Sequence, residues 1–109
     1  MRKHLARFLS QLNLLLHSCD IHPQATVGTG IFFPHPLGLV IGRRVCIGDN
    51  GTIYHNVTIG QRYASARSEP TNADYPSFGD NVVIAAGANV PGKVHIGNNA
   101  IVGANVVVQ

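Results

Sequence analysis

A period of six residues runs through most of this chain and restricts its fold more than any other feature. Large apolar residues occupy the first position of each hexad, and most hexads carry a second apolar residue four positions later. The first positions are Ile21, Val27, Phe33 and Leu39, then, after a slip of two residues at Leu39–Ile41, Ile41, Ile47, Ile53 and Ile59, and finally Phe78, Ile84, Val90, Ile96, Val102 and Val108. This period matches neither the 3.6 residues of an α-helical turn nor the alternation of an ordinary strand. It predicts short strands with a turn in every hexad, wound into a β-helix.

The remaining segments divide one domain, residues 1–109, into a helix and a solenoid. Residues 1–18 carry leucines and a phenylalanine at helical spacing, so we expect an amphipathic helix that packs against the start of a β-helix over 20–109. A membrane-surface role for this helix is the alternative, although no segment is long enough to span a bilayer. The polar stretch 60–77 interrupts the hexads and predicts an excursion loop. A solenoid normally ends in a polar cap, so we expect further residues or a neighbouring chain to cover the end at Val108–Gln109.

Composition excludes several functional classes. Hydrophobic residues make up 45% of the chain and charged residues only 12%, which predicts exposed apolar surface and self-association. A formal charge of +3 without a long basic stripe argues against nucleic-acid binding, while a basic rim that attracts a phosphate-bearing ligand stays open. Cys19 and Cys46 form no CxxC pair and are interpreted as free thiols of a cytoplasmic protein.

Several segments carry a resemblance to a known family. Hexads such as IGRRVC, IGDNGT, FGDNVV and VGANVV resemble those of the left-handed parallel β-helix acyltransferases. The segments 20–42, 47–60 and 78–108, above all the DIHP start followed by PHPLG, are more specifically similar to serine acetyltransferases. The resemblance implies an all-β fold: a left-handed parallel β-helix of hexapeptide repeats with a short N-terminal α-helix and the excursion loop 60–77.

The resemblance also implies a catalytic pair. His35 stands where the family has its catalytic histidine, and Asp20 where the family has the carboxylate that orients it. The chemistry needs such a pair, because a hydroxyl is a poor nucleophile until a base removes its proton and a carboxylate fixes the tautomer of that base. His55 is predicted to stack on His35 one coil later and to line the acceptor pocket; the alternative is an ordinary residue of the solenoid wall.

Other positions assign the two substrates. Ala86 and Ala104 match the small residues that line the family's pantetheine groove, and the N–H of Gln61, after Gly60, matches the position of an oxyanion donor. The chain departs from the family at Pro34, where the family has Asp, and at Tyr75, where it has a second His. We assign both positions to the acceptor pocket.

These matches predict an acetyl-CoA-dependent O-acetyltransferase that needs no metal and acts as a homotrimer. The departures, together with the lack of a counterpart to the helical domain preceding the family's coils, favour a sugar or surface-polysaccharide precursor as acceptor over serine. Two other functions stay open: a zinc-dependent, carbonic-anhydrase-like β-helix using residues such as His17 and His22, and a non-catalytic scaffold.

Overall fold

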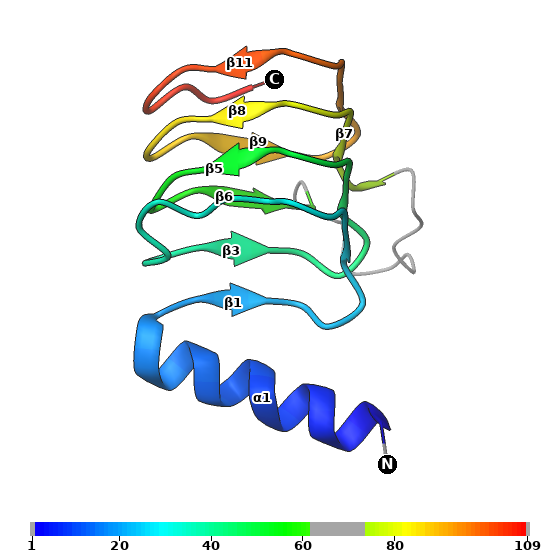
Figure 1. The fold of residues 1–109 in the computed structure, drawn as a ribbon, viewed down its shortest axis with the longest axis vertical. Helices are drawn as coiled ribbons and strands as arrows, with labels where there is room; N and C mark the ends of the chain where they lie inside the picture. Colours follow the sequence, from blue (N-terminus) through cyan, green and yellow to red (C-terminus); the bar gives the residue numbers. More distant parts are fainter. Residues whose placement is uncertain (1, 62–73, 109) are drawn as a thin grey trace.

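One α-helix and a stack of short parallel strands make up the described part of the chain. The computed structural model describes residues 2–61 and 74–108, beginning with α1 (Arg2–His17) beneath the stack (Figure 1). The strands are β1 (Asp20–Ile21), β2 (Thr26–Val27), β3 (Val40–Ile41), β4 (Cys46–Ile47), β5 (Thr52–Ile53), β6 (Thr58–Gly60), β7 (Ser77–Phe78), β8 (Val83–Ile84), β9 (Asn89–Pro91), β10 (His95–Ile96) and β11 (Ile101–Val102). Among these residues, no helix is long and apolar enough to cross a membrane.

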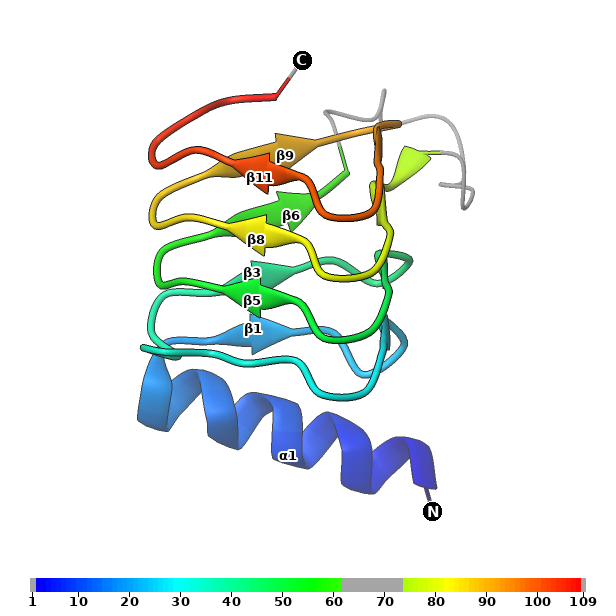
Figure 2. The same cartoon turned by 45° about the horizontal axis from the view of Figure 1, so that its top comes forward.

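The strands form three parallel sheets, one on each side of a triangular coil. Sheet A has the order β1-β3-β6-β9, sheet B the order β10-β7-β4-β2, and sheet C the order β11-β8-β5. Each coil visits the three sheets in turn, so strands adjacent in a sheet are one coil apart in the sequence (Figure 2). The predicted parallel β-helix is therefore correct, and the hexad is its repeating side.

The slip in the period lies earlier than the sequence pattern indicated. Phe32 pairs with Thr52, a separation of twenty residues. The backbone N–H of Val40 bonds to the carbonyl of Val57, which aligns Leu39 with Val57, a separation of only eighteen residues. The corner between sheets C and A therefore holds six residues in the first coil, 34–39, and four in the second, 54–57. The N–H of Asn56 bonds to the carbonyl of Leu37, which aligns Leu37 with His55, so the two extra residues lie within 34–36 and the slip predicted at Leu39–Ile41 is wrong in position.

Asparagine and glycine turn the chain at the corners. Asn56 and Asn105 have φ values of 57° and 58°, and Gly38 and Gly87 have φ values of 64° and 74° at the equivalent corner positions. Glycine and asparagine adopt this left-handed conformation more readily than other residues. A Cβ on Gly38 would lie 2.2 Å from Oδ1 of Asn56 in the next coil, so the stack also limits the size of the side chain there.

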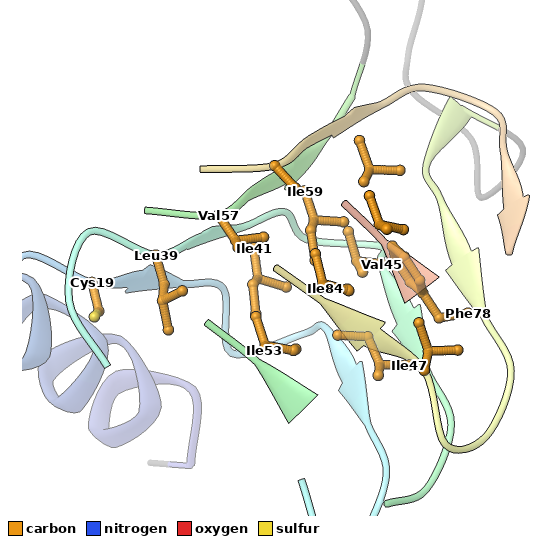
Figure 3. Packing of buried hydrophobic residues seen from close by; sticks show 14 residues of the cluster. Cys19, Leu39, Ile41, Val45, Ile47, Ile53, Val57, Ile59, Phe78 and Ile84 are labelled. Carbon is orange, nitrogen blue, oxygen red and sulfur yellow. The ribbon is translucent and has the colours of Figure 1, made fainter. Parts of the chain in front are cut away.

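The interior of the coil is apolar. Leu39, Ile41 and Ile59 point into the same interior in Figure 3, and each is at most 1% exposed. Burying an aliphatic side chain of this size contributes about 1.5–3 kcal/mol relative to leaving it exposed. No polar or charged residue among those described is buried, so burial of the hexad positions is the main source of stability for the coils.

Helix α1 contacts the coil through a different face from the one its apolar residues predict. Ser10 Oγ donates a hydrogen bond to the carbonyl of Ile21, and Ala6 and Ser10 are half-buried. The predicted contact stripe is exposed instead at Leu5, Phe8, Leu9 and Leu12, where Phe8 is 59% exposed. Small side chains allow the helix to approach β1 closely, which explains the choice of face. The side chains of residues 13–17 lie outside the described part of the structure.

The predicted loop 60–77 has its ends in regular structure. Gly60 is the last residue of β6 and Ser77 the first of β7, so the break in the hexads covers 61–76. Residues 62–73 lie outside the described residues. The two strands on either side of the break continue the stack, since β6 belongs to sheet A and β7 to sheet B.

Candidate active site

Three of the predicted site residues form a column along the corner between sheets C and A, and a fourth, His35, lies beside it. His55, Ala86 and Ala104 are equivalent in the second, third and fourth coils: the N–H of Gly87 bonds to the carbonyl of His55 and that of Asn105 to Ala86. In the first coil the N–H of Asn56 bonds to the carbonyl of Leu37, so Leu37 is the equivalent of His55. The registers Phe32↔Thr52, Ile53↔Ile84 and Ile84↔Val102 stack these corners directly above one another. The column follows the left side of Figure 1, where the chain passes from β5 to β6 and from β8 to β9.

His35 is exposed on an irregular turn. It lies between Pro34 and Pro36, and its carbonyl accepts a 2.7 Å hydrogen bond from the N–H of Leu37. This tight turn accommodates the two extra residues of the first corner. Proline removes a backbone donor and restricts φ, so the two prolines hold the turn away from regular strand geometry. The imidazole is thereby presented at the surface of the column.

The two imidazoles at this corner are in contact. The ring centroids of His35 and His55 are 5.7 Å apart with an interplanar angle of 80°, an edge-to-face arrangement. The two rings therefore meet, but edge-to-face and not as the stacked equivalents on adjacent coils that the sequence predicted, because Leu37 occupies the position over His55. Such a contact restricts the orientation of the exposed ring, because an edge of one imidazole faces the π surface of the other.

His55 has a buried nitrogen with an unmet requirement. Its Nδ1 is the one buried side-chain nitrogen or oxygen without a hydrogen-bond partner among the described residues. Leaving such an atom unsatisfied costs roughly 1–3 kcal/mol. Buried unsatisfied groups are rare in folded proteins, and they are more frequent where strain or chemistry serves a function.

Asp20 starts β1 close to the turn that carries His35. The N–H of Asp20 donates to the carbonyl of Leu39 at 2.7 Å, and the thiol of the buried Cys19 donates to the carbonyl of Pro36 at 3.0 Å. The neighbours of Asp20 and His35 are thus bonded to each other. In the described part of the chain, no hydrogen bond joins the exposed Asp20 carboxylate to the imidazole of His35, so their pairing stays a prediction.

A second group of predicted residues lies at another corner of the coil. Tyr75 packs over Gly42, next to Gly60: a Cβ on Gly42 would lie 2.9 Å from Cε1 of Tyr75 and 3.3 Å from Cα of Gly60. Gly60 also accepts a hydrogen bond from the N–H of Gly92, and Gln61 follows it at the corner between sheets A and B. One side of the triangle, sheet A, therefore separates this group from the histidines.

The width of that side decides what a single chain can do. Gly60 follows His55 by five positions, a span of at most about 16 Å at about 3.3 Å per residue. A reacting carbon must lie about 3 Å from both the nucleophile and the oxyanion donor. Because sheet A lies between them, we expect that His35 and the N–H of Gln61 of one chain do not act on the same carbonyl.

The described residues contain no group of three or more histidine, cysteine or acidic side chains that could hold a metal ion. His22 Nδ1 accepts a hydrogen bond from the N–H of Gln24, and the side chain of His17 lies outside the described part of the structure. The zinc hypothesis gains no support from the residues around His22.

Comparison with known proteins identifies the family. Residues 75–109 match the profile described as bacterial transferase hexapeptide (six repeats). The chain is 43% identical, over 94% of its length, to a serine acetyltransferase of Staphylococcus aureus (strain Mu50 / ATCC 700699), and 41% identical, over 95%, to one of Helicobacter pylori (strain ATCC 700392 / 26695). The chain is a serine acetyltransferase-like member of the hexapeptide-repeat acyltransferases. It spans about half the length of these relatives, 46% and 58% respectively.

Solved structures agree with this assignment. A serine acetyltransferase in complex with CoA superposes with a TM-score of 0.85 at 34% identity, covering 99% of this chain and 42% of the other. The Neisseria gonorrhoeae serine acetyltransferase in complex with serine gives a TM-score of 0.86 at 37% identity, with coverage of 99% and 42%. The predicted left-handed parallel β-helix with a short N-terminal helix is confirmed.

Proposed function

We propose that this serine acetyltransferase-like chain carries the active site of an acetyl-CoA-dependent O-acetyltransferase whose acceptor is the hydroxyl of serine. The observation that carries the proposal is the column of His55, Ala86 and Ala104, with the imidazole of His35 beside it in contact with that of His55. A base needs an exposed, oriented imidazole, and an extended thioester substrate needs a wall without bulky side chains. The column offers both on one edge of the molecule.

The choice of serine departs from the sugar expected from Pro34 and Tyr75. The relatives from Staphylococcus aureus and Helicobacter pylori are serine acetyltransferases, and the structure from Neisseria gonorrhoeae is in complex with serine. The comparisons therefore favour the alternative over the sugar. In this proposal Pro34, Tyr75 and His55 still line the acceptor pocket, with Tyr75 contributed from the other corner.

His35 acts as the general base. Its neutral imidazole removes the proton of the serine hydroxyl while that oxygen attacks the carbonyl carbon of the acetyl thioester. The carbonyl oxygen becomes an oxyanion, which the N–H of Gln61 after Gly60 stabilises. When the carbon–sulfur bond breaks, the imidazolium of His35 returns the proton to the CoA thiolate. The products are O-acetylserine and CoA, and the imidazole is neutral again.

Asp20 orients the base in this scheme. Its backbone lies beside the His35 turn through the bonds of Cys19 to Pro36 and of Asp20 to Leu39. We place a carboxylate–imidazole hydrogen bond between these two exposed side chains. Such a bond fixes the ring tautomer and stabilises the imidazolium that forms during transfer.

A homotrimer completes the site. The histidines and the Gln61–Tyr75 group lie at different corners of one coil, with sheet A between them, so in this proposal they meet when the corner of one chain faces another corner of a second. Rotation about a threefold axis repeats such a heterologous contact three times and closes it. Exposed apolar side chains beside the column, Phe32 and Ile101, support burial against a neighbouring chain.

The decisive experiment is to follow CoA release from acetyl-CoA with serine, and separately with a panel of hexoses and amino sugars. We expect turnover with serine, from a species with the mass of a trimer in light scattering. Faster release with a sugar would replace serine by that sugar, and the absence of release with any acceptor would favour the scaffold. A fully active monomer would overturn the shared site, and activity abolished by chelators would favour the zinc enzyme.

A further inference from the structure

A basic cleft lies between the first turns of α1 and the corners that follow β1 and β3. Its volume is about 610 Å³, and Figure 1 shows the N-terminal end of α1 beneath the turn after β1. It is lined by Arg2, Lys3, His4, Ala6, Arg7, His22, Pro23, Gln24 and Arg43. Four of the chain's eight lysines and arginines converge here, although Arg43 is far from the helix in sequence.

The side chains of the cleft present donors and no carboxylate. Nε of Arg43 donates to the side-chain oxygen of Gln24, which ties the guanidinium to the corner of the preceding coil. The N–H of Gln24 donates to Nδ1 of His22 at 3.1 Å, so Nε2 of this imidazole carries the proton and is a donor. Two bonds thus orient Arg43 and His22, which reduces the entropy lost when they bind an anion.

Electrostatics favours a negatively charged occupant. Arg2, Lys3, Arg7 and Arg43 repel one another within the cleft, and none of the lining residues is acidic. A bound anion removes this repulsion, and guanidinium groups match phosphate oxygens with paired hydrogen bonds. The volume of the cleft lies within the range of sites for small ligands, roughly 300–1,000 Å³.

We propose that this cleft is a binding site for a small phosphate-bearing anion with at least two negative charges. Arg43 and Arg7 contact its phosphate oxygens from opposite walls, and Nε2 of His22 donates a further hydrogen bond. The site lies beneath β1 at the end of the coils next to α1, and its ligand is separate from the thioester along the histidine column. It does not depend on the proposed transferase activity.

The geometry of α1 favours a small anion over an anionic bilayer. Successive helical residues are rotated by about 100°, so Leu5, Phe8 and Leu12 lie on the side of the helix away from Ala6 and Ser10, which face the coil. These exposed apolar side chains therefore point away from the cleft. A membrane that held these residues would not reach the arginines, whereas a small anion enters the cleft from solvent.

The test is isothermal titration of the 109-residue chain with inorganic pyrophosphate at low ionic strength. We expect saturable binding that weakens as salt is added. Arg43→Gln should lower the affinity about tenfold, equivalent to about 1.4 kcal/mol, because a hydrogen bond between two charged groups is lost. Arg7→Gln, on the exposed helix surface, should have a similar effect. Arg44→Gln is the matched control: it removes the same charge from the adjacent position, which lines a different pocket, and should leave the affinity within about twofold.

Three results would overturn the proposal. The first is no heat of binding at millimolar pyrophosphate. The second is an equal loss of affinity in Arg43→Gln and Arg44→Gln, which would mean attraction by net charge alone. The third is tighter binding of a short polyglutamate peptide, or of vesicles containing phosphatidylserine, than of pyrophosphate, which would assign the cleft to a protein or a membrane. Because the readout is binding, each result is independent of whether acetyl transfer is observed.

Discussion

The corner between sheets C and A is built in two ways within one molecule. In the third and fourth coils it has four residues, and its second position is occupied by Ala86 or Ala104. In the second coil the same position carries His55 and in the first it carries Leu37, with His35 beside it on a corner that is longer by two residues. The part of the corner with Ala86 and Ala104 therefore has small side chains on a regular backbone, whereas the part with His35 and His55 has imidazole side chains and, in the first coil, an irregular backbone.

The difference shows how a solenoid acquires chemistry. A regular hexad fixes the direction of every side chain, because each residue rests on its equivalent in the coil below. The extra residues within 34–36 interrupt this repetition without disturbing the core, since Leu39 returns to the interior. The interruption exposes His35 on a turn while the next coil holds His55 against it. The regular coils form a rigid surface, and the irregular turn in the first coil presents the proposed base, His35.

The largest effect on catalysis should come from removing the imidazole of His35. His35→Ala should lower kcat for acetyl transfer by about 10²–10⁴-fold, the usual contribution of a general base. The melting temperature should not change, because the imidazole is exposed. CoA release under saturating acetyl-CoA and serine measures the effect.

His95→Ala provides the matched control for this variant. His95 is an exposed imidazole on sheet B, paired in register with Ser77 and away from the column. We expect its removal to leave kcat close to that of the unmodified protein. Near-normal turnover in His35→Ala, or an equal loss in both variants, would contradict the assignment of the base.

A second pair of variants tests where the extra residues lie. Leu39 is 0% exposed and Leu37 is 55% exposed, although they are two positions apart in the same corner. Leu39→Ala should lower the free energy of unfolding by about 2–5 kcal/mol, and Leu37→Ala by no more than about 0.5 kcal/mol. Urea denaturation measures both. Equal destabilisation would mean that both leucines share the core and that the slip is elsewhere.

The smallest effect should come from a substitution at Ala86, where the column has a small side chain. Ala86→Leu places a bulky side chain on the wall proposed for the thioester substrate, so the KM for acetyl-CoA should rise about tenfold, or about 1.4 kcal/mol. The KM for serine serves as an internal control and should change little. An unchanged KM for acetyl-CoA in a folded Ala86→Leu variant would place the donor outside the column.

The sequence predicted some parts of this molecule better than others, for physical reasons. Burial of Ile41, Ile59 and Ile84 follows directly from the hexad, because a residue repeated in phase with the coil always faces the same way. The contact of His35 with His55 was predicted because both follow a large apolar residue at the same distance, although Leu37 and not His35 is the equivalent of His55. The orientation of α1 was predicted wrongly, since the apolar stripe gave no weight to the close approach that Ala6 and Ser10 permit.

By itself, the sequence determined the coil and its parallel sheets, because both depend on a period that is visible in one dimension. The tertiary structure decided the arrangements that this period does not contain. It placed the extra residues of the first corner within 34–36 and aligned Leu37, instead of His35, with His55. It also separated Tyr75 and Gln61 from the histidines by the width of sheet A, and brought Arg43 beside the first turns of α1. These arrangements join residues that have no common phase in the repeat, so only the packing of corners and helix in three dimensions fixes them.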